Sequence, residues 1–152
     1  MRLLILAVGR LKTGPHAELQ THYAGRITWP LEIREVEERR TLSAPERKAR
    51  EGELLLGALP EGSVLVALDE RGKSFASPAF AERLARWREE GTKTLAFAIG
   101  GADGLAPAVL QRAALTLSLG PMTWPHLLAR GLLLEQLYRA QQILAGHPYH
   151  RD

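Results

Sequence analysis

Short apolar runs alternate with longer amphipathic stretches along the chain. The apolar runs have the length of β-strands and cover residues 3–8, 31–36, 64–68, 95–99 and 115–119. The amphipathic stretches have the length of helices and cover residues 15–26, 44–59, 78–90, 107–114 and 126–145. Strands that alternate with helices are typical of parallel sheets. The pattern therefore predicts an α/β fold, with one domain over residues 1–152 and a mainly parallel sheet flanked by helices.

Local signals predict where two of these helices begin. Ser43 and Glu46 have the spacing of a capping box, in which the serine side chain accepts a hydrogen bond from the first helical turn. Ser77 is followed by Pro78, which predicts an N-cap serine with proline in the first turn. We therefore expect helices to begin directly after Ser43 and Ser77.

The last predicted helix carries apolar residues around most of its circumference. Its leucines, together with Tyr138 and Ile143, occupy more than one stripe of about 100°. Such a helix needs cover on several sides, and in a small chain the cover can come from a second copy. We therefore expect a homodimer with this helix in or near the interface. The alternative is a central core helix in a monomer.

Composition excludes several classes of protein. The chain of 152 residues has no cysteine, which rules out disulfide frameworks, thiol nucleophiles, iron–sulfur clusters and cysteine zinc sites. No run of 18 apolar residues is present, and residues 3–9 resemble a first strand more than a signal peptide. We expect a cytoplasmic protein that does not enter a membrane. The net charge of +3 permits an acidic partner such as RNA.

Three segments that follow strands have the composition of ligand-binding loops. They cover residues 69–73, 100–104 and 120–126. In open parallel sheets a ligand binds beyond the carboxyl ends of the strands, so we expect all three segments to lie at one edge. Neither GxGxxG nor GxxxxGK[ST] is present, so the sequence fails the tests for a Rossmann dinucleotide site and for a P-loop.

The carboxyl-terminal residues combine imidazoles, an aromatic ring and a fixed cation. Three of the five histidines are His126, His147 and His150, but no HExxH motif and no i, i+4 histidine pair exists, so we expect no metal site. Tyr149 and Arg151 stand beside these histidines and would suit stacking on a base and contact with phosphate. A frayed, solvated terminus is the alternative. The absence of a GxSxG elbow gives nucleophilic hydrolysis little support.

Four blocks of sequence carry a resemblance to a known family. They read ALDERGKSFASPAFA at residues 67–81, FAIGGADGL at 97–105, LSLGPMTWPHLLAR at 117–130 and EQLYRAQQILAGHPYHR at 135–151. In this order and spacing they resemble the RlmH family of bacterial 23S rRNA pseudouridine N3-methyltransferases, within the SPOUT superfamily. The resemblance extends over essentially the whole chain.

The resemblance implies a fold, a cofactor and a substrate. It implies a SPOUT-type fold whose carboxyl-terminal part forms a trefoil knot, an exception to unknotted topology. It also implies an obligate homodimer that uses S-adenosyl-L-methionine, without a metal, to methylate N3 of a pseudouridine in 23S rRNA of assembled ribosomes. The cofactor-binding residues that it implies are Leu68, Gly101, Gly120, Pro121, Met122, Thr123, Trp124 and Pro125. Gly120 and Pro121 stand where members of the family often carry a serine and a variable residue, so any side-chain hydroxyl contact there is lost.

We expect a pseudouridine pocket built from the last helix and the tail, with the tail of one subunit closing the site of the other. Its residues would be His126, Arg139, Tyr149, His150 and Arg151. The arginines would hold phosphate or stabilise the developing N3 anion, and the tyrosine would stack on the base or hydrogen-bond to it. His126, His150 or water would accept the proton. A SPOUT enzyme acting on tRNA and a dimeric, non-catalytic RNA-binding or ribosome-binding module are the alternatives.

Overall fold

The computed structural model describes the backbone of residues 1–151 and the side chains of residues 1–149. Its strands are β1 (Arg2–Val8), β2 (Leu31–Val36), β3 (Val64–Ser74), β4 (Thr94–Ile99) and β5 (Leu115–Ser118). Its helices are α1 (Pro15–Ala24), α2 (Ala44–Ala58), α3 (Ser77–Glu89), α4 (Pro107–Arg112), α5 (His126–Leu144) and the 3-10 helix η1 (Pro148–Arg151). The strands form one parallel sheet in the order β2-β1-β4-β3-β5, which confirms the predicted fold class.

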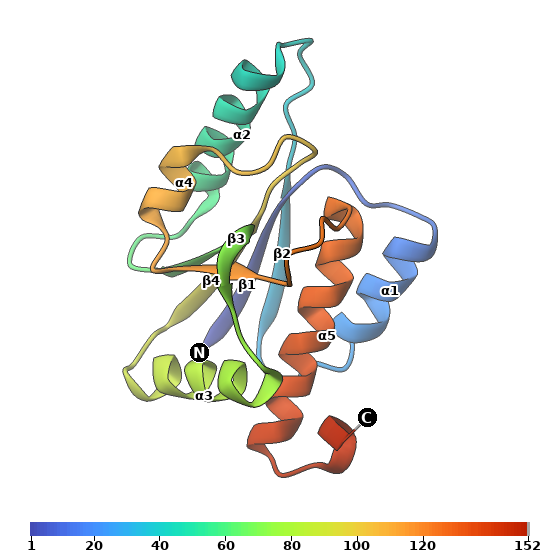
Figure 1. Ribbon diagram of the computed structural model, residues 1–152, viewed down its shortest axis with the longest axis vertical. Coiled ribbons are helices and arrows are strands. Elements are labelled where there is room, and N and C mark those ends of the chain that lie inside the picture. Colours follow the sequence, from blue (N-terminus) through green and yellow to red (C-terminus); the bar gives the residue numbers. More distant parts are fainter. Residues whose placement is uncertain (152) are drawn as a thin grey trace.

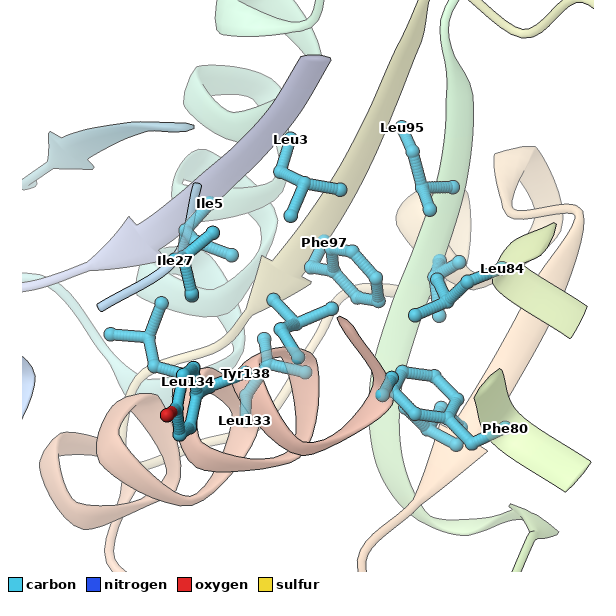
Figure 2. Packing of buried hydrophobic residues seen from close by; sticks show 14 of the residues in the cluster. Leu3, Ile5, Ile27, Phe80, Leu84, Leu95, Phe97, Leu133, Leu134 and Tyr138 are labelled. Carbon is cyan, nitrogen blue, oxygen red and sulfur yellow. The ribbon is translucent and has the colours of Figure 1, made fainter. Parts of the chain in front are cut away.

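Helices cover both faces of the sheet because the strands are apolar on both sides. In β1, Leu3 and Ile5 point to the face covered by α1, α3 and α5, while Leu4 and Leu6 point to the face covered by α2 and α4 (Figure 1). The first face holds the larger core. Figure 2 shows Phe97 of β4 at its centre, between side chains of α3 and α5.

Helix α5 is buried largely by its own chain. Leu133, Leu134 and Leu137 are fully buried in the core shared with β1, β4 and α3. Cover on several sides is therefore present within one subunit, as the monomeric alternative required. The homodimer and the trefoil knot stay predictions of the sequence.

Strand β3 is longer than the predicted run of residues 64–68, because it resumes after an irregularity. The pairing with β5 shifts between Leu68 and Lys73, and both of these residues lie opposite Leu117. Within the intervening segment the Asp69 carboxylate accepts a hydrogen bond of 2.8 Å from the backbone N–H of Arg71, which is a local turn. The predicted loop at 69–73 is therefore a bulge inside a strand.

The two predicted helix starts have different outcomes. The Ser43 hydroxyl accepts a hydrogen bond of 3.3 Å from the Glu46 N–H, so this cap is confirmed. The prediction for Ser77 is wrong, because α3 begins at Ser77 itself and Ala76 is the N-cap. The Ser77 hydroxyl donates instead to Gln136 of α5 at 2.7 Å, a tertiary contact that competes with capping.

Candidate functional site

A cleft of about 690 Å³ lies at the carboxyl ends of the central strands. It is lined by segments that follow β4 and β5 and by the bulge of β3, so the prediction that these three segments meet is confirmed. The lining residues are Lys48, Leu68, Asp69, Glu70, Arg71, Ile99, Gly100, Gly101, Ala102, Asp103, Gly104, Leu105, Leu117, Leu119, Gly120, Met122, Thr123, Trp124, Pro125, His126 and Ala129. Of the predicted cofactor-binding residues, only Pro121 is outside this lining.

The first two glycines of the turn after β4 have little room for a side chain. A Cβ on Gly100 would lie 2.7 Å from the backbone of Gly104, and a Cβ on Gly101 would lie 3.0 Å from Val8 Cγ1. Gly104 has a φ of +82°, a conformation that favours glycine. The turn therefore presents bare backbone to the cleft, so a ligand can approach its N–H and C=O groups closely.

The segment after β5 is tied to the bulge of β3. The Ser118 hydroxyl lies 3.0 Å from the carbonyl oxygen of Glu70, and the Thr123 hydroxyl donates to the Glu70 carboxylate at 2.8 Å. Met122 and Trp124 are the large apolar side chains left exposed, at 70% and 42%. The segment after β5 is therefore held in place by hydrogen bonds to Glu70, and it places exposed apolar side chains at the rim of the cleft.

His126 begins α5 at the edge of the cleft, one helical turn before a buried arginine. Arg130 is fully buried, and its guanidinium donates to the Glu35 carboxylate at 2.6 Å and to the carbonyls of Gly9 and Val8 at 3.0 and 3.2 Å. Burial, together with the charge of Arg130, lowers the pKa of His126 below its ordinary value. The imidazole is therefore neutral at neutral pH and can accept a proton.

The opposite end of α5 holds the other predicted catalytic groups. Arg139 forms an ion pair of 2.6 Å with Glu135, and its guanidinium lies 4.9 Å from the centre of the Tyr149 ring. The Tyr149 hydroxyl donates to Glu135 at 3.2 Å, and the ring packs edge-on against Tyr138. Burial, with contributions from Tyr23 and Glu135, raises the pKa of Tyr149 to about 12, so the phenol keeps its proton.

One chain does not bring these two groups of residues together. His126 and Arg139 are thirteen positions apart on the same helix, which at 1.5 Å per residue separates them by about 20 Å. Figure 1 shows the carboxyl terminus at the far end of α5 from the start of that helix. The predicted roles of His150 and Arg151 lie outside the described side chains.

Sequence reasoning missed two buried charged residues beside the cleft, Arg130 and Glu51. The partner of Arg130 is distant in sequence, since this arginine pairs with a carboxylate 95 positions away. A charged residue inside an otherwise apolar helix face is the signal that marks Arg130 in the sequence. Glu51 carries no such mark, because its helix is rich in charged residues throughout.

No group of three or more metal-binding side chains lies within the described residues. None of the helices in the described part of the chain is long and apolar enough to cross a membrane.

Comparison with known proteins assigns the family. Residues 1–150 match the family described as "Predicted SPOUT methyltransferase". The chain belongs to the SPOUT methyltransferase family. Among SPOUT methyltransferases it is 58% identical over 151 residues to "Ribosomal RNA large subunit methyltransferase H" of Rhodospirillum centenum, covering 99% of both chains. It is 56% identical over 152 residues to the protein of that name from Rhodospirillum rubrum, with both chains covered completely.

A solved structure has the same fold at low sequence identity. A methyltransferase from Legionella pneumophila, Lpg2936, solved with its cofactor SAM, superimposes with a TM-score of 0.50 and 15% identity. The match covers 92% of this chain and 66% of that one. At this identity the likeness concerns the fold alone.

Proposed function

We propose that the protein is an S-adenosyl-L-methionine-dependent methyltransferase that methylates N3 of a pseudouridine in 23S rRNA of assembled ribosomes. One observation carries the proposal: the bulge of β3 and the segments that follow β4 and β5 line a single cleft, in a chain that belongs to a methyltransferase family. The names of its relatives at 58% and 56% identity support large-subunit rRNA as the substrate. Such a substrate is consistent with a cytoplasmic protein.

The cleft suits the cofactor in shape and chemistry. Leu68, Ile99 and Leu117 give it an apolar wall for an adenine ring, and the turn at Gly101 offers backbone donors and acceptors. Met122 and Trp124 can cover the ring from the opposite lip. When bound, S-adenosyl-L-methionine supplies an electrophilic methyl group on a sulfonium, and this chemistry needs no metal.

The substrate pocket is completed by a second subunit in this proposal. His126 lies at the cleft, while Arg139 and Tyr149 lie about 20 Å away along α5. All three can act on one nucleotide only if the far end of α5 comes from the partner subunit. A homodimer that sets the tail of each subunit against the cleft of the other meets this requirement. The tail would also bring His150 and Arg151 to that cleft.

The residues then divide the work of methyl transfer. The bond from sulfur to methyl breaks as the bond from N3 to methyl forms, and the N3 proton leaves to a base. His126 is neutral and lies at the cleft, so it can accept that proton, with His150 and water as the other acceptors. Arg139 and Arg151 can stabilise negative charge that develops on the base, and Tyr149 can stack on it.

Transfer of a labelled methyl group tests the proposal. The protein is incubated with labelled S-adenosyl-L-methionine and one of four substrates: ribosomes lacking the modification, isolated 50S subunits, naked 23S rRNA or tRNA. The labelled nucleoside is then identified by mass. We expect N3-methylated pseudouridine from ribosomes.

Other outcomes distinguish the alternatives. Label in tRNA would indicate the related SPOUT activity. The absence of label in every substrate, together with no shift in melting temperature on adding the cofactor, would leave a binding module without catalysis.

A further inference from the structure

A buried carboxylate stands behind the glycine turn of the cleft. Glu51 of α2 is only 7% exposed, and its Oε1 has no hydrogen-bond partner within the described part of the chain. A buried polar group without a partner is costly, so such groups are rare in folded proteins. Glu51 does not line the cleft and takes no part in the proton transfer proposed above.

Only backbone separates Glu51 from the cleft. A Cβ built on Gly101 would lie 3.2 and 3.4 Å from the two carboxylate oxygens of Glu51. Gly101 itself lines the cleft. Because this glycine has no side chain, the carboxylate approaches the cleft as closely as a peptide backbone allows.

Two other carboxylates at this wall are paired with arginines, and the carboxylate of the exposed Glu70 accepts a hydrogen bond from the Thr123 hydroxyl. Asp103 pairs with Arg47 at 2.9 Å, and Asp69 pairs with Arg71 at 3.1 Å. In the described residues no salt bridge joins Glu51 to a cation, although Arg47 lies one helical turn before it on α2. When Glu51 is ionised, the wall therefore carries one buried negative charge that is not fully compensated. In a medium of low dielectric such a charge acts over several ångströms.

We propose that Glu51 makes the cleft prefer a cationic cofactor over a neutral one. This rests on the proposed function, in which the bound molecule is a sulfonium before methyl transfer and an uncharged thioether, S-adenosyl-L-homocysteine, after it. The carboxylate attracts the sulfonium through the Gly101 backbone and has no such attraction for the thioether. Transfer of the methyl group therefore weakens binding and favours release of the product. Glu51 is a specificity determinant, not a catalytic residue, because it touches neither ligand.

Isothermal titration calorimetry with two ligands tests this inference. Kd is measured for S-adenosyl-L-methionine and for S-adenosyl-L-homocysteine with the wild-type dimer and with Glu51→Gln, which keeps the shape and removes the charge. We expect Glu51→Gln to lower the preference for the cationic ligand by about fivefold. A merely structural role would weaken both ligands equally and leave the ratio of the two Kd values unchanged, which would overturn the inference.

Glu53→Gln is the matched control. Glu53 lies on the same helix and loses the same charge, but its side chain is 68% exposed and pairs with Arg50. We expect its ratio of Kd values to equal that of the wild type, and an equal drop in both variants would overturn the inference. If the wild type binds neither ligand, the proposed function fails with it. If it binds both and Glu51→Gln changes nothing, only the inference fails.

The pH dependence gives a second readout. Burial, followed by the nearby Asp103 carboxylate, raises the pKa of Glu51, whereas Arg47 opposes the shift. The preference for the cationic ligand should fall as pH decreases through this raised pKa in the wild type. Glu51→Gln should lack that component while retaining any contribution from Asp103 and from the cleft-lining Lys48, Asp69 and Glu70. Identical profiles for the two proteins would contradict the inference.

Discussion

The two ends of α5 hold arginines in opposite surroundings. Arg130 has no exposed surface and donates to a carboxylate and to two backbone carbonyls of the β1 end. Arg139 keeps 16% of its side chain exposed and lies against Tyr149 and Glu135, near the carboxyl terminus. Arg130 joins α5 to β2 and to the end of β1 within one chain. Arg139 keeps part of its surface open to another molecule. The cleft end is therefore preorganised, and the tail end suits contact with a partner or a substrate.

The largest difference should appear in stability. Arg130→Met would remove the buried cation that pairs with Glu35 and the donor to the Val8 and Gly9 carbonyls, although Glu35 keeps its hydrogen bond from the Leu11 N–H. We therefore expect a loss of about 3 kcal/mol in the free energy of unfolding. Arg139→Met removes a pair that keeps part of its surface exposed and should cost less than Arg130→Met. Urea unfolding followed by circular dichroism measures both. Equal losses in the free energy of unfolding for the two variants would contradict the distinction between the two ends of α5.

Arg139 should matter more for methyl transfer than for stability. Arg139→Ala should reduce methyl transfer by about a hundredfold or more, because it removes a charge from the proposed substrate pocket, while leaving cofactor affinity unchanged. Single-turnover assays and calorimetry separate these two quantities. A weakened cofactor affinity would show that Arg139 serves the cleft of its own subunit.

Mixed dimers test whether the cleft and the tail of one site come from different subunits. Gly101→Ser should abolish cofactor binding, since a side chain there meets Val8 and Glu51. Subunits carrying Gly101→Ser mixed with subunits carrying Arg139→Ala should recover about a quarter of wild-type activity, because half of the dimers are mixed and each has one intact site. No recovery after subunit exchange would mean that cleft and tail of the same subunit cooperate.

His126 tests the chemistry of the cleft end. Since burial and Arg130 lower its pKa, the imidazole becomes the neutral base as pH rises through a value below 6.5. The single-turnover rate should therefore increase with pH, with an inflection below pH 6.5. His126→Asn should reduce the rate by about a hundredfold and remove this inflection. Retention of the inflection in the variant would assign it to another group.

The smallest effect is expected midway along α5. Ser77→Ala removes the hydrogen bond that joins α3 to Gln136 and should cost about 1 kcal/mol in the free energy of unfolding. Ser43→Ala removes a helix cap of similar strength on the other face and provides a matched control. Neither variant should alter cofactor affinity. A change in affinity for Ser77→Ala alone would show that α3 is coupled to the cleft.

The sequence predicted the elements well because burial on both faces makes each parallel strand a continuous apolar run. It predicted the cleft because the carboxyl ends of such strands meet at one edge. The return of β3 at Lys73 was not predictable, since residues 69–72 are turn formers and only pairing with β5 makes them a bulge. The ion pair and hydrogen bonds of Arg130 were not predictable either, because their partners are distant in sequence. Helix length alone does imply that His126 and Arg139 cannot share a pocket within one chain.

The hydrogen bond from Arg130 to Val8 has a consequence for biosynthesis. It spans 122 positions, and the strand that it closes pairs with β4, a segment far along the chain. Contacts of such long range form slowly, because the intervening loop must be closed first. A growing chain cannot complete its cleft until nearly the whole polypeptide has been synthesised. Ligand binding is thus a property of the finished molecule and never of the nascent one.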